Sequence, residues 1–114
     1  MARFRVLLTD YAWPDLDIER AIMQEIDAEL IVAGKGKNER TTAEMAELAK
    51  GCDAILFNWA SVPKEVIAAA GDGLKICSRI GVGIDNVDMA YCTSRGIPVT
   101  NVPDYCVIEV AEHA

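Results

Sequence analysis

The chain has 114 residues, of which 52% are hydrophobic and 25% are charged, and its formal net charge at pH 7 is -7. This composition is typical of one folded domain with its own core and excludes a disordered chain. The negative charge disfavours binding to nucleic acid or to an anionic membrane surface.

The N-terminal sequence MARFRVLLTDY has too short an apolar stretch for a signal peptide, and no segment approaches membrane-spanning length. We therefore expect a cytoplasmic protein that does not enter a membrane. The four cysteines are widely spaced and form no C-x-x-C pair: Cys52, Cys77, Cys92 and Cys106. This spacing predicts reduced, mostly buried thiols and no metal site.

The first half of the chain alternates apolar runs with helical patterns. Residues 3–10 (RFRVLLTD) predict a strand, and residues 15–27 predict a helix with three isoleucines on one face: Ile18, Ile22 and Ile26. A second strand is expected at 28–34 and a second helix at 41–51. In that helix Thr41 and Glu44 have capping-box spacing, and Gly51 stands where a left-handed terminal residue belongs.

The second half continues the alternation. A nearly all-apolar third strand is expected at 52–60, followed by a helix at 63–71 that Pro63 opens. The remaining predicted elements are a strand at 74–80, a helix at 86–96, a strand at 97–103 and a helix at 106–114. The last pattern has no stop signal, so we expect the natural chain to continue beyond Ala114.

Five strands that are each followed by a helix predict a parallel sheet with right-handed crossovers. We expect an α/β fold in the flavodoxin-like, doubly wound order, with a five-stranded parallel sheet in a three-layer αβα arrangement. In such sheets ligands bind outside the carboxyl ends of the strands. Four stretches are expected at that edge, although each could also be plain turn chemistry: 10–13, 58–61, 81–83 and 103–105.

The loop in SRIGVGIDNVD (78–88) carries two glycines, and Asn86 stands where a dinucleotide-binding loop would have its third. Main-chain N–H groups of Val82 and Gly83 at such a place suit a small carboxylate better than a dinucleotide. Arg79 could add a bidentate contact or could simply face solvent. Trp59 could pack in the core or wall an apolar pocket.

The only histidine, His113, has no nucleophile in an identifiable arrangement around it, so a structural role is favoured. No catalytic residue is predicted in this chain.

Three segments then carry a resemblance in order and spacing: GVGIDNVD (81–88), RGIPVTNVP (95–103) and VAEH (110–113). The chain resembles the N-terminal part of a D-isomer-specific 2-hydroxyacid dehydrogenase, the family that includes phosphoglycerate and D-lactate dehydrogenases. The resemblance implies that residues 1–114 form the flavodoxin-like substrate-binding or lid domain. It also implies a downstream Rossmann domain for NAD or NADP, which is absent from this chain.

By the same resemblance, the main-chain N–H groups of Val82 and Gly83 grip the carboxylate of a small 2-oxo or 2-hydroxy acid. Asn58 and Trp59 belong to the pocket-wall turn, Arg79 lies near the substrate, and Val82 also touches the cofactor side. The isolated chain is expected to be inactive and to bind no cofactor by itself.

Two further expectations concern association. The residues near the terminus, Val107, Ile108, Val110 and Ala111, would expose apolar surface, which predicts a homodimer through the C-terminal segment. The alternative function is a free-standing flavodoxin-like interaction module or an isolated fragment without catalysis. A receiver domain is disfavoured because Asn58 stands where that fold needs an aspartate after its third strand.

Overall fold

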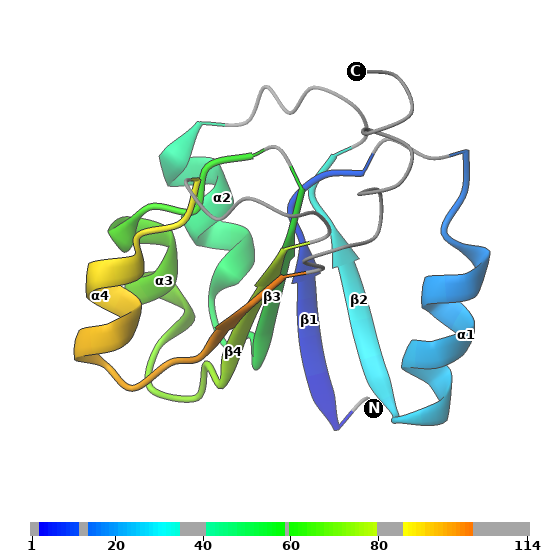
Figure 1. The fold of residues 1–114 in the computed structure, drawn as a ribbon. Coiled ribbons are helices and arrows are strands. Elements are labelled where there is room, and N and C mark those ends of the chain that lie inside the picture. The colour runs from blue at the N-terminus through cyan, green and yellow to red at the C-terminus, as the bar shows by residue number, and fades with distance from the viewer. Residues whose placement is uncertain (1–2, 12–13, 35–40, 59, 80–85, 102–114) are drawn as a thin grey trace, which may run out of the picture.

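The computed structural model describes residues 3–11, 14–34, 41–58, 60–79 and 86–101. Within them, five parallel strands are arranged in the order β2-β1-β3-β4-β5 (Figure 1). The strands are β1 (Phe4–Leu8), β2 (Ala28–Val32), β3 (Ala54–Phe57), β4 (Ile76–Arg79) and β5 (Val99–Thr100). The described helices are α1 (Asp17–Glu25), α2 (Thr42–Ala49), α3 (Lys64–Ala70) and α4 (Met89–Ser94). This is the flavodoxin-like strand order, as predicted.

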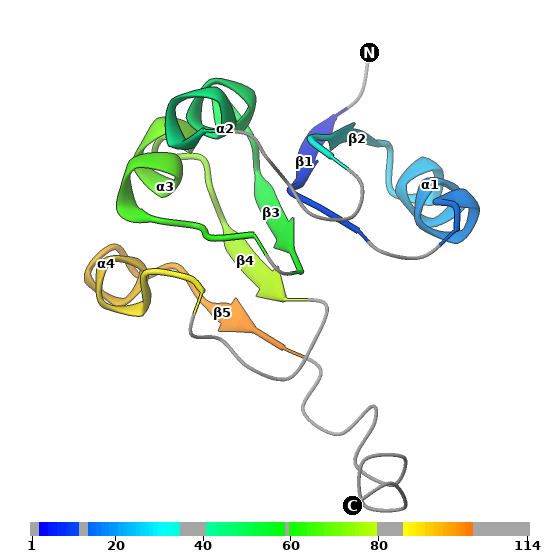
Figure 2. The same ribbon diagram turned by 90° about the horizontal axis from the view of Figure 1, so that it is seen from above.

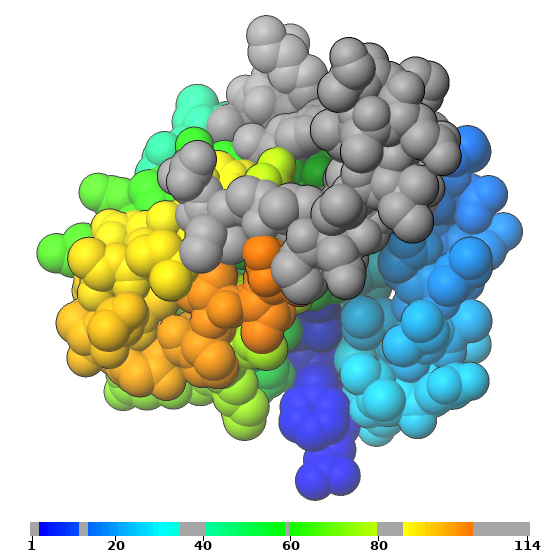
Figure 3. Space-filling model, in the orientation of Figure 1, coloured from blue at the N-terminus to red at the C-terminus, as the bar shows by residue number. Residues whose placement is uncertain are grey.

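The helices form two layers around the sheet. Figure 2 shows α2, α3 and α4 along one face, and α1 on the other side beside β2. In Figure 3, α1 and β2 form one flank of the molecule and α4 forms the opposite flank. The three-layer prediction is therefore confirmed.

The hydrophobic core lies between the sheet and the layer of α2, α3 and α4. Leu7 pairs with Ile55 in the parallel register, and Ile55 pairs with Cys77, so these three side chains point to the same face. All three are fully buried, and Val66 and Ile67 of α3 pack into the same cluster. Burial of a whole apolar side chain stabilises the fold by about 1.5–3 kcal/mol, so this face anchors the sheet.

Helix α1 differs from the other helices because none of its residues is buried. The sequence placed three isoleucines on one face of this helix, and the structure leaves that face open to solvent. Ile18 is 73% exposed, Ile22 50% and Ile26 51%. The helical spacing of the isoleucines was predicted correctly, but this spacing alone does not show that another element packs against the apolar face.

The predicted ends of α2 are confirmed. The Thr41 hydroxyl accepts the Glu44 N–H at 3.1 Å, and the Glu44 carboxylate accepts the Thr41 N–H at 3.2 Å. This reciprocal pair satisfies two N–H groups that the first helical turn leaves free. Gly51 has φ +74°, the left-handed conformation that the sequence assigned to it.

Within the described residues, the fifth strand begins later than predicted, and the end of α4 is the reason. The Ile97 N–H bonds to Cys92 O at 2.9 Å and so closes the end of α4 instead of extending β5. Pro98 has no N–H to donate, and its carbonyl accepts from Cys77 at 3.1 Å. The strand therefore begins at Val99 and runs to Thr100, and residues 102 and 103 of the predicted strand lie outside the described residues. The helix predicted at 106–114 lies outside the described residues.

No helix in the described segments is long and apolar enough to cross a bilayer.

Candidate functional site

Three neighbouring strands bring polar side chains to one edge of the sheet. Asp10 follows β1, Asn58 follows β3, and Arg79 ends β4. The Thr9 N–H bonds to Leu56 O at 2.9 Å, which continues the pairing of β1 with β3 up to this edge. Because parallel strands present their carboxyl ends together, these residues come from distant parts of the sequence to one place.

Asp10 is fully buried, and one of its oxygens accepts three hydrogen bonds. Oδ1 accepts the Thr9 hydroxyl at 2.8 Å, the Asn58 N–H at 3.1 Å and the Ala60 N–H at 3.2 Å. A buried carboxyl group is tolerated only when such bonds replace its hydration. Asp10 therefore holds the main chain at Asn58 and at Ala60, and the name 58–60 turn refers to these two residues.

The carbonyl groups of the 58–60 turn are held from other elements. Arg79 Nε donates to Asn58 O at 2.9 Å. Asn86 Nδ2 donates to Asn58 O at 3.0 Å and to Ala60 O at 2.8 Å. Because both carbonyls can only accept, the amide nitrogen of Asn86 must be the atom that faces them. Its Oδ1 is buried and has no hydrogen-bond partner within the described residues.

Asn86 is itself fixed by its main chain. Its carbonyl accepts the Val62 N–H at 2.7 Å, and the Asp88 N–H bonds to Val62 O at 3.1 Å. These bonds form an isolated parallel bridge between Val62 and Val87. Asp88 then caps α4 by accepting the Tyr91 N–H at 3.0 Å. The amide of Asn86 is thus held between a short bridge and a helix start.

The 58–60 turn consequently has main-chain N–H and C=O groups hydrogen-bonded at both of its residues. The N–H and C=O groups of Asn58 and Ala60 are bonded to side chains from three separate segments: Asp10, Arg79 and Asn86. Asn58 is only 6% exposed. A turn held in this way can present neighbouring groups to a small molecule with little loss of freedom on binding.

Of the residues that the sequence predicted for the site, the structure brings Asn58 and Arg79 together. Arg79 is half-buried and bonded to the turn, so it is not simply a solvent-facing arginine. A side-on contact to a carboxylate through Nε would require this bond to break. The remaining predicted residues lie outside the described segments: Trp59, Val82, Gly83, Cys106, His113 and the C-terminal residues 107–114.

Sequence reasoning missed two contributors. Asp10 was placed at the edge without a role, and Asn86 was read only as the residue that replaces a third glycine. The signal for Asp10 was a single acidic residue directly after an apolar strand. No local signal marked Asn86, because its partners are 26 and 28 residues away.

The described cysteines are buried and free: Cys52, Cys77 and Cys92. Burial raises the pKa of the Cys77 thiol to about 12, and the neighbouring Cys92 adds to this rise. Burial also raises the pKa of Cys52 and Cys92. These thiols are protonated at neutral pH and are not activated nucleophiles. In the part of the chain that the structure describes, no group of three or more His, Cys, Asp or Glu residues could hold a metal ion.

Comparison with known proteins gives a consistent result. Residues 6–114 match the family model described as D-isomer specific 2-hydroxyacid dehydrogenase, catalytic domain. The chain is 41% identical to the D-3-phosphoglycerate dehydrogenase of Synechocystis sp. over 78 residues, which are 68% of this chain and 14% of that protein. It is 33% identical to the D-lactate dehydrogenase of Lactobacillus delbrueckii subsp. bulgaricus over 107 residues, which are 91% of this chain and 32% of that protein.

A solved structure is also similar. The NAD+-bound 3-phosphoglycerate dehydrogenase of Entamoeba histolytica superposes with a TM-score of 0.72 and 25% sequence identity, over 88% of this chain and 33% of that one. In each of these three comparisons, the match spans about a third or less of the relative.

Proposed function

This chain belongs to the D-isomer specific 2-hydroxyacid dehydrogenase family, and we propose that it is the substrate-binding portion of an oxidoreductase that interconverts a small 2-oxo acid and its 2-hydroxy acid. The observation that carries the proposal is the 58–60 turn, which three side chains fix at the carboxyl edge of the sheet. Ligands of open parallel sheets bind at this edge.

In the proposed site, the substrate carboxylate is held by the main-chain N–H groups of Val82 and Gly83. Asn58 and Trp59 form the wall, and Arg79 contributes positive charge near the acid. Hydrogen bonds from N–H groups to an anion are stronger than hydrogen bonds between neutral groups. They therefore suit the recognition of a small acid that offers few other contacts. These assignments come from the sequence motif and from the position of the fixed turn.

The described residues do not fit the pyrophosphate of NAD or NADP, the cofactors that the family implies. Each of the four described helices carries an acidic residue at its N-cap or in its first turn: Asp17 and Glu19 in α1, Glu44 in α2, Glu65 in α3 and Asp88 in α4. Carboxylates there repel a second anion from the positive end of the helix dipole. We therefore propose that residues 1–114 are the substrate-binding domain, with Val82 on the cofactor side, and that a separate Rossmann domain binds NAD or NADP.

The proposal is tested with the complete product of the gene, including any sequence that follows Ala114. We expect NADH- or NADPH-dependent reduction of at least one of glyoxylate, hydroxypyruvate and pyruvate. The variant Gly83→Val should lower kcat/KM by a factor that corresponds to a loss of about 2–3 kcal/mol in transition-state stabilisation, as for losing a charge-assisted contact. A folded Gly83→Val protein with unchanged kcat/KM would overturn the carboxylate site.

A second candidate function is a free-standing interaction module without catalysis. The exposed isoleucine stripe of α1 favours it, because soluble monomers rarely expose contiguous apolar patches. A reading frame that ends at Ala114, together with inactivity toward every 2-oxo acid in the panel, would replace the enzyme with this alternative.

We also propose a cytoplasmic homodimer that binds neither nucleic acid nor membrane and associates through the C-terminal segment. The apolar sequence near residues 107–111 supports this association. Light scattering should give a dimer, and Ile108→Asp should dissociate it. A monomer in the unsubstituted protein would exclude the homodimer, and a dimer that survives Ile108→Asp and Val107→Asp would place the interface elsewhere.

A further inference from the structure

The buried carboxyl group of Asp10 has a feature that folding alone does not require. A neutral side chain could end β1 at this point without the cost of burying a carboxyl group, which is several kcal/mol unless hydrogen bonds compensate. Instead, one oxygen atom collects the N–H groups of two residues in the same turn, Asn58 and Ala60, across 48 and 50 residues of sequence. Both bonds converge on one atom, so Asp10 Oδ1 holds the two N–H groups around a common point.

Asn86 repeats this arrangement with the opposite polarity. One nitrogen atom donates to the carbonyls of the same two residues, Asn58 and Ala60. The turn is therefore held by an acceptor from the end of β1 and by a donor from the segment before α4. Both holds are made to main-chain atoms of Asn58 and Ala60, so neither depends on the side chains of these two residues.

We propose that Asp10 and Asn86 are positioning residues of the substrate site: together they fix the 58–60 turn where it meets the bound 2-oxo acid. This inference rests on the proposed function. Asp10 and Asn86 act through main-chain atoms of the turn and do not touch the substrate. When the hydrogen bonds of Asp10 or of Asn86 are lost, the 58–60 turn shifts as the wall of the substrate site, while the cofactor site is unaffected.

The kinetic signature of this role differs from that of a purely structural one. A variant that only lowers the folded fraction reduces the number of active sites, so kcat falls and KM stays constant. A displaced wall weakens the contact with the acid, so KM for the 2-oxo acid rises in the folded protein. A shift of about 1 Å in a binding group can cost about 100-fold in kcat/KM.

The test uses the complete gene product and its best 2-oxo acid. We expect Asp10→Ala and Asn86→Ala each to raise KM by about 10-fold or more, with the dissociation constant for NADH, or for NADPH if that is the cofactor used, changing less than about twofold. Inhibition by oxamate should weaken by a similar factor. Asp10→Asn keeps an oxygen acceptor at the same place and should recover most of the loss.

Asp53→Ala is the matched control, because Asp53 also accepts a main-chain N–H across 48 residues but lies at the opposite edge of the sheet. It should leave KM within about twofold. Unchanged KM in folded Asn86→Ala and in folded Asp10→Ala would overturn the inference, as would an equal rise in Asp53→Ala. If Asp10→Ala does not fold, Asn86→Ala decides. Inactivity of the unsubstituted protein would remove the proposed function and this inference together, whereas activity with unaffected variants removes only the inference.

Discussion

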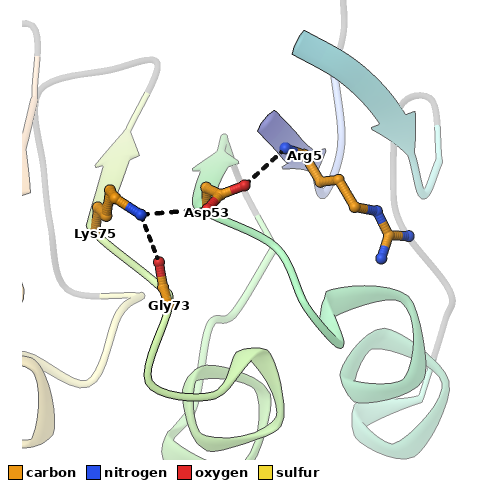
Figure 4. Close-up of polar contacts among 4 residues, drawn as sticks. All are labelled: Arg5, Asp53, Gly73 and Lys75. Carbon is orange, nitrogen blue, oxygen red and sulfur yellow. Dashed lines mark hydrogen bonds and ion pairs between the residues drawn. The ribbon is translucent and has the colours of Figure 1, made fainter. Parts of the chain in front are cut away.

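Asp53 joins β3 to β1 at the amino edge of the sheet, and Asp10 joins the same two strands at the carboxyl edge. Asp53 Oδ2 accepts the Arg5 N–H at 2.9 Å, and Asp10 Oδ1 accepts the Asn58 N–H at 3.1 Å. Figure 4 shows Asp53 between Arg5 and Lys75, whose ammonium lies 3.3 Å from Oδ1. The Asp53 side chain keeps 26% of its exposure, whereas Asp10 is fully buried.

The difference in burial between Asp53 and Asp10 indicates that the two edges of the sheet have different roles. At the amino edge, solvent and the Lys75 ammonium stabilise the charge of the Asp53 carboxylate, so the bond to the Arg5 N–H connects the two strands at little cost. At the carboxyl edge, Asp10 is shielded from water, and the bonds that it accepts hold a turn in the candidate site. The same kind of bond is therefore a simple strand connection in one place and part of the candidate site in the other.

The largest expected effect is the loss of stability in Asp10→Ala. The substitution leaves the buried N–H of Asn58 and the partly buried N–H of Ala60 without their acceptor, at a cost of about 1–3 kcal/mol for a buried group and less for a partly buried one. We expect a total loss of about 3 kcal/mol, measured by urea unfolding.

The same measurement on Asp53→Ala should give a loss of about 1 kcal/mol, because water can replace the carboxylate at the exposed edge. Equal losses for the two variants would show that the two edges do not differ in the way proposed.

A smaller effect is expected from Gly51→Ala, which probes how tightly the amino edge is packed. The positive φ of Gly51 disfavours any side chain, and an added Cβ would lie 3.2 Å from Arg5 Nη1, which binds Lys50 O at 3.1 Å. We expect a loss of about 1–2 kcal/mol in the free energy of unfolding.

Gly73→Ala is the control for that variant, because an added Cβ there meets no atom within 4 Å and φ is not positive. It should change stability by less than about 0.5 kcal/mol. If both alanine variants behave alike, the backbone conformation at Gly51 is not what limits substitution.

The smallest effect concerns pH. The Arg5 N–H has the largest influence on Asp53 and, together with Lys75, holds its pKa below the usual value of 3.8, although partial burial acts to raise it. A carboxyl group with a lowered pKa in the folded state stabilises the fold above its unfolded pKa, and this contribution is lost as the pH falls through the folded pKa. Asp53→Asn should therefore be less stable than the unsubstituted protein at pH 7, and the difference should shrink below about pH 3.8 in urea unfolding. A difference that grows on acidification would contradict this sign.

Several elements follow from local sequence alone. Thr41 and Glu44 form the capping box that their spacing predicts, because both partners lie within one helical turn. Gly51 adopts the left-handed conformation that glycine permits without steric cost. The alternation of strands and helices also determines the parallel sheet, since parallel strands need a crossover between them.

The sequence by itself determined the fold class and the family motifs, and it placed Asn58 and Arg79 at the sheet edge where the structure brings them together. Only the tertiary structure decided that Asp10 and Asn86 hold the 58–60 turn, and that the isoleucine face of α1 is left exposed. The physical reason is the distance along the sequence between the residues that interact. Periodicity and caps depend on neighbours within about one turn. The bonds of Asp10 join residues 48 and 50 positions apart, and they arise only when the sheet register brings the ends of its strands together.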